Sequence, residues 1–258
     1  MTLIDTHCHL NDAEAFPDPA ATLAEASAAG VTRVIVVGVD AEDSRRAIDL
    51  AERYDGVYAI VGWHPNYTAR YSPEGLEQIA GMLGHPKVVA LGEIGLDFHW
   101  QYATLEQQRR ALFDQLDLAE RTHVPVVFHC REAYPALLDI LEARPILPYL
   151  FHCFAGDEAD ARRAVGLGSY FGIDGPITYK KSTELREIIR SLPRDRIVVE
   201  TDSPYLSPEP FRSQTNKPAN VAIVNAALAT TLGISQEECA ATTSENAESF
   251  FRIGSTTP

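Results

Sequence analysis

Six side chains of the kind that bind metal ions interrupt otherwise apolar segments. The first two, His7 and His9, are two residues apart in LIDTHCHL. If this segment is a strand, both side chains point to the same face about 7 Å apart, which suits two imidazoles that bind one metal ion. A lone His-x-His pair is a weak signal, because surface histidines and core histidines produce it as well. The pair therefore gains weight only together with ligands from elsewhere in the chain.

The other four candidates lie inside or at the end of further apolar segments. Glu93 lies within VVALGEIGL, where a carboxylate is costly unless it is paired or binds a metal ion. The alternative for Glu93 is a buried structural salt bridge. His129 ends VVFH, His152 ends YLFH and Asp202 ends IVVETD. Taken singly, each of these three has an ordinary structural explanation, a hydrogen-bonded core histidine or a helix-capping aspartate.

Eight short apolar or β-branched segments recur along the chain and alternate with helical patterns. Continuous apolar strands are typical of a parallel sheet that is covered on both faces. Helix signals support the alternation, since Thr104 and Gln107 form a capping box and Ser235 begins a new helix just after Gly233 ends one. The predicted strands are 3–10, 33–39, 57–64, 88–96, 125–130, 149–154, 169–175 and 197–202.

We therefore expect an α/β fold, a single parallel (β/α)8 barrel of the TIM type. Two helical stretches follow the eighth predicted strand, and we expect these extra C-terminal helices to pack outside the barrel. The 258 residues match the length of about 250 that one such barrel needs, so we expect one metal-dependent hydrolase domain over residues 1–258. An open doubly wound sheet is the alternative. It is less favoured because no glycine-rich phosphate loop follows the first strand.

A parallel barrel explains why the six candidates matter together. The C-terminal ends of all strands meet at one mouth of the barrel, where the active sites of this fold lie. Imidazoles and carboxylates at that mouth suit zinc, manganese, or magnesium with bound water. Six ligands are too many for one catalytic zinc ion that keeps an open position. We therefore expect two divalent ions bridged by one carboxylate.

The composition indicates an acidic, soluble protein. Lys and Arg total 22 against 36 Asp and Glu, which gives a net charge of −14 and no broad positive field for coating a duplex. A nucleic acid would have to be attracted locally, by metal ions and a few basic residues. There is no signal-peptide pattern and no apolar stretch near the roughly 18 residues of a membrane span. We expect a cytoplasmic protein with no membrane contact, and nothing indicates an obligate protein partner.

The four cysteines do not form a zinc or disulfide pattern. Cys8, Cys130 and Cys153 each follow a candidate ligand histidine by one residue. Because side chains alternate along a strand, these three cysteines are expected to face outward and pack under the helices. Cys239 is expected to pack within the last helix.

Seven short motifs run in order from the first residues of the chain nearly to the last. They are DTHCHL at 5–10, GWHP at 62–65, GEIGLDF at 92–98, FHCRE at 128–132, FHCFAG at 151–156, ETDSPYLSP at 200–208 and ENAESFF at 245–251. Several are short, but the complete ordered set is highly specific. It resembles the TatD family of metal-dependent deoxyribonucleases, which are amidohydrolase-like barrels.

This resemblance implies a division of the ligands between two ions. Glu93 would bridge the ions and belong to both sets. The first ion would be held by His7, His9, Glu93 and Asp202, and the second by Glu93, His129 and His152.

The resemblance also implies roles for residues around the ions. His64 of GWHP would face the substrate, although from the residues alone a turn histidine before Pro65 is the simpler interpretation. Glu200, two residues before Asp202 on the same strand face, would orient a ligand. Arg131 and Arg212 could contact phosphates near the mouth, with a solvated surface charge as the alternative for each.

The sequence departs from the family pattern after the eighth strand. The family has an arginine-glycine-lysine run followed by Asn-Glu-Pro, whereas this chain has FRSQTNKP at 211–218 and lacks the glycine and that lysine. Phe98 also stands where tyrosine is common, which removes one possible phosphate donor. The departures fall at the expected barrel mouth, so they bear on the substrate more than on the metal ions.

The predicted activity is metal-dependent hydrolysis of DNA. Two ions about 3.5–4 Å apart can activate a bridging water as hydroxide and polarise a phosphoryl oxygen, with Asp202 accepting the proton of the water. Family resemblance favours a 3′-5′ exonuclease on single-stranded DNA, with bases stacking on aromatics such as Trp63, Trp100 or Tyr205. One alternative keeps the site and changes the substrate, a D-aminoacyl-tRNA deacylase or another ester or amide hydrolase. A non-catalytic metal-binding scaffold is less favoured, because the ligand set is complete.

Overall fold

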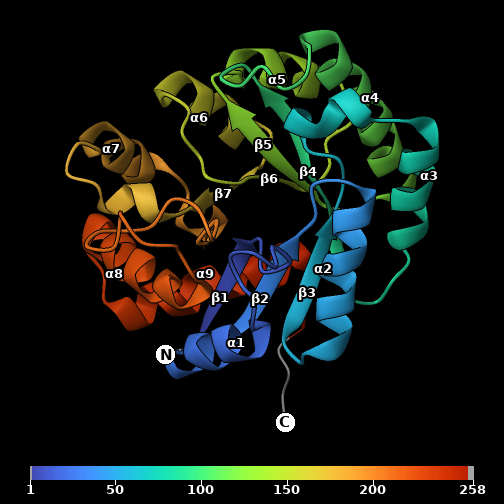
Figure 1. The fold of residues 1–258 in the computed structure, drawn as a ribbon. Helices are drawn as coiled ribbons and strands as arrows, with labels where there is room; N and C mark the ends of the chain where they lie inside the picture. The colour runs from blue at the N-terminus through green and yellow to red at the C-terminus, as the bar shows by residue number, and fades with distance from the viewer. Residues whose placement is uncertain (1, 255–258) are drawn as a thin grey trace.

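Eight parallel strands form a barrel in the computed structural model, which describes residues 2–254 (Figure 1). The strands are neighbours in chain order, and Cys8 bridges Ser203 where the first and last strands meet. The backbone N–H of Asp202 also donates to the carbonyl of His7 (2.9 Å). The predicted barrel is confirmed. Its strands are β1 Leu3–Cys8, β2 Val31–Val37, β3 Val57–Val61, β4 Val88–Asp97, β5 Val126–Arg131, β6 Tyr149–Phe151, β7 Tyr170–Ile173 and β8 Ile197–Val199.

Helices connect the strands and surround the barrel (Figure 1). Local signals fix several ends: Thr104 and Gln107 form the expected capping box, and Gly233 ends its helix in the left-handed conformation that glycine adopts without strain. The α-helices are α1 Pro19–Ala28, α2 Ala41–Arg53, α3 Pro73–Met82, α4 Leu105–Thr122, α5 Tyr134–Glu142, α6 Glu158–Gly166, α7 Thr183–Ser191, α8 Val221–Leu232 and α9 Gln236–Phe251. Short 3-10 helices are η1 Pro65–Arg70, η2 Gly175–Thr178, η3 Arg194–Arg196 and η4 Pro218–Asn220.

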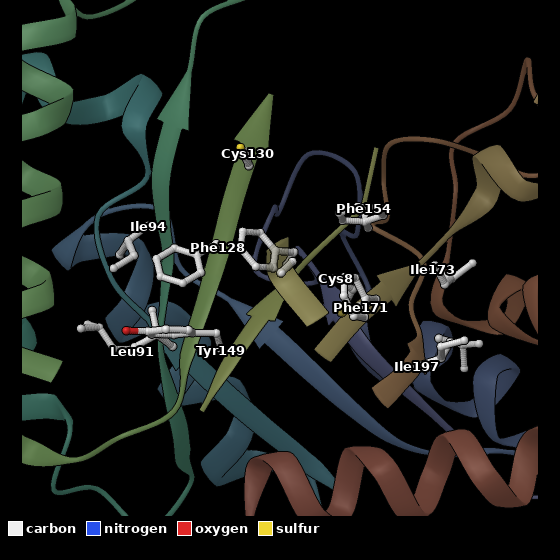
Figure 2. Close-up of a cluster of buried hydrophobic side chains, with 14 of the residues drawn as sticks. Cys8, Leu91, Ile94, Phe128, Cys130, Tyr149, Phe154, Phe171, Ile173 and Ile197 are labelled. Atoms are coloured by element: carbon white, nitrogen blue, oxygen red, sulfur yellow. The ribbon is translucent and has the colours of Figure 1, made fainter. Parts of the chain in front are cut away.

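The outward faces of the strands pack under the helices. Figure 2 shows this layer on successive strands, with Leu91, Phe128, Tyr149, Phe171 and Ile197 fully buried. Removing this much apolar surface from water supplies the main driving force for folding. It also holds the strands rigidly, which fixes the positions of side chains at their C-terminal ends.

The interior of the barrel is filled by a second, smaller apolar cluster. Ile4, Ile35 and Ile60 belong to it, and so do Phe250 and Phe251 at the end of α9. The extra C-terminal helices are therefore present as expected, and α9 closes the barrel at the N-terminal ends of the strands. The opposite mouth, at the C-terminal ends, stays free for a site.

No single helix between residues 2 and 254 has both the length and the apolarity to cross a membrane. Only the bent pair Pro218–Leu232 and Gln236–Phe251, which turns by 107°, reaches those limits jointly.

Candidate metal centre

The six predicted ligands, Glu93 among them, gather at the C-terminal mouth of the barrel. The two carboxylate oxygens of Glu93 face different histidines. Its Oε2 lies 3.3 Å from His7 Nε2, whereas its Oε1 lies 2.8 Å from His129 Nδ1 and 2.9 Å from His152 Nε2. A carboxylate whose two oxygens face different histidines can be a ligand in more than one group.

Asp202 completes the first group of ligands. Its Oδ1 lies 3.5 Å from His9 Nε2 and 3.9 Å from His7 Nε2. Potential ligand atoms of these three residues all lie within 4.8 Å of one another, close enough to surround one ion. The structure thus brings together every residue to which the sequence assigns a metal.

Three overlapping clusters have ligand atoms within 4.8 Å of one another in the described part of the chain. Two of these clusters share Glu93. They divide the histidines differently from the expected sets, because one pairs His152 with His7 and the other adds His64 to His129. The clusters are His7, His9 and Asp202; His7, Glu93 and His152; and His64, Glu93 and His129.

His7 provides the clearest test of whether these residues fit a metal ion. Its side chain is fully buried, yet neither Nδ1 nor Nε2 has a hydrogen-bond partner. An unpaired buried polar atom is expensive, so a native structure needs a reason for it. A divalent ion at Nε2 supplies that reason, and imidazoles with carboxylates are the donors that such ions take.

The two carboxylates of the site are in the ionised form that metal ligands need. Burial raises the pKa of Glu93, but the charge of His152 and the hydrogen bond to His129 more than offset it, so the pKa lies well below its ordinary value. Burial likewise raises the pKa of Asp202, and the hydrogen bond to His9 with nearby imidazoles brings it below the ordinary value. Both carboxylates are therefore ionised at neutral pH.

Three ligand histidines have an acceptor near the ring nitrogen that faces away from the ligand cluster, within hydrogen-bond distance for His9 and His129 and within ion-pair distance for His152. The Nδ1 atom of His9 lies within hydrogen-bond distance of the carbonyl oxygen of Val37 (3.2 Å). The ring of His129 uses Nε2 on Asp97 Oδ2 (2.9 Å), and that of His152 places Nδ1 3.3 Å from Glu200 Oε1. Such partners fix the ring orientation and leave the other nitrogen free to bind a metal ion.

Glu200 lies beside His152, one of the ligands that it is predicted to orient. Its carboxylate is fully buried and accepts the backbone N–H of Cys153 (2.6 Å) and the hydroxyl of Thr6 (3.3 Å). Gly172 on β7 makes room for it, because a Cβ there would lie 2.3 Å from Glu200 Oε2. Its Oε1 lies 3.3 Å from His152 Nδ1, a position from which it can orient that ring.

Asp97 is the important residue that the sequence interpretation missed. It is buried, and besides His129 it accepts the backbone N–H of His99 (2.9 Å) and Trp100 (3.0 Å). Gln108 on α4 clamps its backbone through two hydrogen bonds of 2.9 Å each. A signal was present, since Asp97 lies four residues after Glu93 on β4 and strand alternation places both on the same face.

His64 faces the ligand cluster from the start of η1. Its Nδ1 accepts the backbone N–H of Asn66 (3.0 Å), and its Nε2 lies 3.6 Å from Glu93 Oε1. Burial lowers the pKa of His64 to about 3, so the ring is neutral. A neutral imidazole that accepts at Nδ1 carries its proton on Nε2, which makes Nε2 a donor and not a metal ligand. This tautomer agrees with a substrate-facing role.

A cavity of about 1890 Å³ opens above the ligands. Arg131, Trp100 and Tyr205 line it, in agreement with the idea that they can meet a substrate there. Arg212 does not line it; its guanidinium lies 4.0 Å from the centre of the Tyr179 ring.

Two expectations about this region are wrong. Trp63 is buried, with its indole N–H bound to the carbonyl of Tyr67, so it packs under η1 instead of meeting bases. Cys153 is only partly buried and lines the cavity, because β6 ends at Phe151 and the alternation that predicted an outward cysteine no longer applies. Cys8 packs in the buried layer as expected, and so does Cys130, although Cys130 also borders the cavity (Figure 2).

Comparison with known proteins places this geometry in a family. The family model described as TatD related DNase matches residues 4–252. The chain belongs to the TatD family. It is accordingly a metal-dependent hydrolase, as the motifs and the ligand cluster predicted.

Several TatD-family relatives match over nearly the full length. A Bacillus subtilis protein named "Uncharacterized metal-dependent hydrolase YabD" is 36% identical, over 97% of this chain and 99% of the relative. A Salmonella typhimurium protein named "3'-5' ssDNA/RNA exonuclease TatD" is 32% identical, over 97% of this chain and 99% of its own. The crystal structure of the TatD homolog YjjV from Escherichia coli superposes with a TM-score of 0.92 at 35% identity, covering 98% of both chains.

Proposed function

We propose that this protein hydrolyses phosphodiesters in single-stranded nucleic acid, removing nucleotides from the 3′ end, with two divalent ions of zinc, manganese or magnesium. The observation that carries the proposal is the ligand cluster around Glu93 on the floor of a large open cavity. Several relatives named as 3′-5′ exonucleases on single-stranded DNA and RNA support the polarity.

The residues have distinct parts in this reaction. The ions, when bound, supply Lewis-acid polarisation of the phosphoryl oxygen and activation of a water molecule. Glu93 would hold them at a fixed separation by presenting one oxygen to each ligand group. Asp202 is the base that we assign to the proton of the attacking water, because its carboxylate is ionised and lines the cavity.

His64 and Arg131 would contact the substrate from above. The tautomer of His64 points an N–H donor toward the ligand cluster, where a non-bridging phosphate oxygen or the leaving oxygen would lie. Arg131 lines the cavity and has no ion pair with a carboxylate within residues 2–254, so its charge is available to a phosphate.

Single strands are favoured by the position of the ligands. They lie at the bottom of a cavity, where the backbone of a rigid duplex would have difficulty reaching them, whereas a flexible end can enter. The net charge of −14 opposes the approach of a polyanion, so local attraction must dominate. Binding should therefore weaken as salt is added, because each phosphate contact releases counterions.

The test is a cleavage ladder with 3′- and 5′-labelled oligonucleotides, single- and double-stranded, with Mg²⁺ or Mn²⁺ and with EDTA. The proposal predicts metal-dependent shortening from the 3′ end of single strands, which Glu93→Gln abolishes. Shortening from the 5′ end would overturn the polarity. No cleavage of any oligonucleotide, with release of D-amino acids from D-aminoacyl-tRNA, would replace the nuclease by the deacylase.

A further inference from the structure

We infer that the single strand leaves the catalytic centre along one particular wall of the cavity, the wall formed by Trp100, Tyr102 and Arg131. We call it the aromatic wall. The bases of the strand would stack on the two rings, and Arg131 would contact the sugar-phosphate backbone of the strand. This inference rests on the proposed nuclease function and adds to it the path of the substrate.

The aromatic wall has the features of a base-stacking surface. Trp100 and Tyr102 are 43% and 64% exposed, and both line the cavity. Their rings are stacked, with centroids 5.6 Å apart and planes inclined by 24°. The guanidinium of Arg131 lies 5.6 Å from the centre of the Trp100 ring. Large exposed rings beside an unpaired cation are the combination that binds single strands without sequence preference.

The wall is physically joined to the metal centre. The backbone N–H of Trp100 donates to Asp97 Oδ1 (3.0 Å), and Asp97 Oδ2 is bound to the ring of His129. One buried carboxylate thus fixes both a ligand histidine and the start of the aromatic wall. A nucleotide stacked on Trp100 would therefore be held at a defined position relative to the ions.

The opposite side of the cavity is unsuitable for a polyanion. It is lined by acidic residues from α2 and from the loops that follow β1 and β2. Its two arginines are already paired, Arg46 with Glu42 and Asp43, and Arg70 with Asp40. The carboxylates on this side are Asp12, Asp40, Glu42 and Asp43.

Two exposed tyrosines, Tyr67 and Tyr205, also belong to this acidic side. Burial raises the pKa of each phenol, and nearby carboxylates raise it further, Asp43 and Asp40 for Tyr67 and Asp12 for Tyr205. These rings offer stacking surface, but the four carboxylates on this side outnumber its two arginines, which leaves a net negative charge that disfavours phosphates.

The two acidic side chains near the aromatic wall already have hydrogen-bond partners. Glu132 is bound to His99 Nδ1 (2.8 Å). Asp157 caps α6 by accepting the backbone N–H of Asp160 (2.9 Å), and the positive end of the helix offsets part of its charge. Of the three arginines that line the cavity, Arg131 alone forms no ion pair with a carboxylate of residues 2–254.

The experiment compares KM for an oligothymidylate among wild type, Trp100→Ala, Tyr102→Ala and Trp100→Phe. Stacking of one base changes binding about 5- to 150-fold, so each Ala variant should raise KM within that range while kcat changes little. Trp100→Phe should recover most of the loss. Hydrolysis of methyl p-nitrophenyl phosphate, which has no nucleobase, should be the same in all four proteins.

Two control variants locate the path. Phe113→Ala removes an exposed ring on α4 that does not line the cavity, and it should leave KM unchanged. Tyr67→Ala removes a ring from the acidic side, and it should raise KM less than twofold. A larger effect of Tyr67→Ala than of Trp100→Ala would place the strand on the acidic side and overturn the inference.

A substrate with abasic sites next to its 3′ end completes the test. Wild type should bind it more weakly than the normal oligonucleotide, and Trp100→Ala and Tyr102→Ala should each distinguish the two substrates less than wild type does. Equal KM values for wild type and both Ala variants on the normal substrate would refute the aromatic wall and leave the nuclease intact. If wild type cleaves no oligonucleotide at all, it is the proposed function that fails.

Discussion

Replacing Asp97 by Asn should weaken metal binding and leave the protein folded. The carboxylate of Asp97 can only accept, so it keeps a proton on His129 Nε2 and directs Nδ1 toward Glu93 (2.8 Å). An amide of the same shape would present N–H donors to the position where His129 now donates. The imidazole would then carry its proton on Nδ1, the atom that has to bind the ion.

The size of the effect follows from the hydrogen bonds. Loss of a partner that orients a ligand histidine costs about 10- to 100-fold in metal affinity. The introduced amide oxygen can still accept from the backbone N–H groups of His99 and Trp100, without the charge. The side-chain amide of Asn66 donates to Asp97 Oδ2 (3.0 Å), and it can rotate so that its Oδ1, which has no partner, accepts from the introduced amide instead. The metal-free protein should therefore lose only about 1 kcal/mol of stability, or roughly 2–4 °C in Tm.

The assay is activity as a function of Mn²⁺ concentration, with thermal unfolding of the metal-free protein alongside. We expect the Mn²⁺ concentration that gives half-maximal activity to rise by about 10- to 100-fold. Saturating Mn²⁺ should restore most of the activity. Asp114→Asn is the matched control, since Asp114 accepts from the Tyr71 hydroxyl (3.0 Å) away from the cavity. An unchanged metal titration for Asp97→Asn would refute the orienting role. Inactivity at every metal concentration would show that Asp97 acts directly in the reaction.

Two further predictions test the placement of side chains. His129→Ala and His152→Ala should abolish turnover with cooperative unfolding retained, whereas Cys8→Ala and Cys130→Ala should keep activity and lose about 1 kcal/mol of stability; cysteine variants that lose activity at unchanged stability would contradict the assigned strand faces. Gly172→Ala should lower kcat/KM about 10- to 100-fold by pushing Glu200 away from His152. Gly166→Ala, with nothing within 4 Å of its added Cβ, is the control and should change little. Equal activity of the two alanine variants would remove Glu200 from its supporting role.

The barrel and the ligand cluster could be predicted from the sequence because both follow from simple rules. Apolar segments that end in a polar residue identify a strand and its C-terminal end at once, as VVFH does for His129. A parallel barrel then brings such ends together whatever their separation in the chain. His7 and Asp202 are far apart in sequence, yet their backbones are hydrogen-bonded where β1 meets the segment after β8.

The rest could not be predicted because it depends on residues beyond the strand ends. Alternation stops where β6 ends, so the partial exposure of Cys153 had no signal in the sequence. Trp63 follows β3, and only the packing of η1 and α3 decides that it is buried. The tautomer of His64 depends on one backbone N–H at the start of η1. Loop and turn geometry of this kind is set by tertiary contacts and not by a repeating pattern.

The central claim is that Glu93 is shared between two ions, and metal content tests it most directly. Purified protein is stripped with chelator, reloaded with Mn²⁺ or Zn²⁺, freed of excess metal and measured by elemental analysis, with Glu93→Gln treated in parallel. The geometry predicts saturation at two ions per chain for wild type and a clear loss in the variant. Saturation at one ion would contradict the bridging role of Glu93, and a value of zero would contradict the site itself.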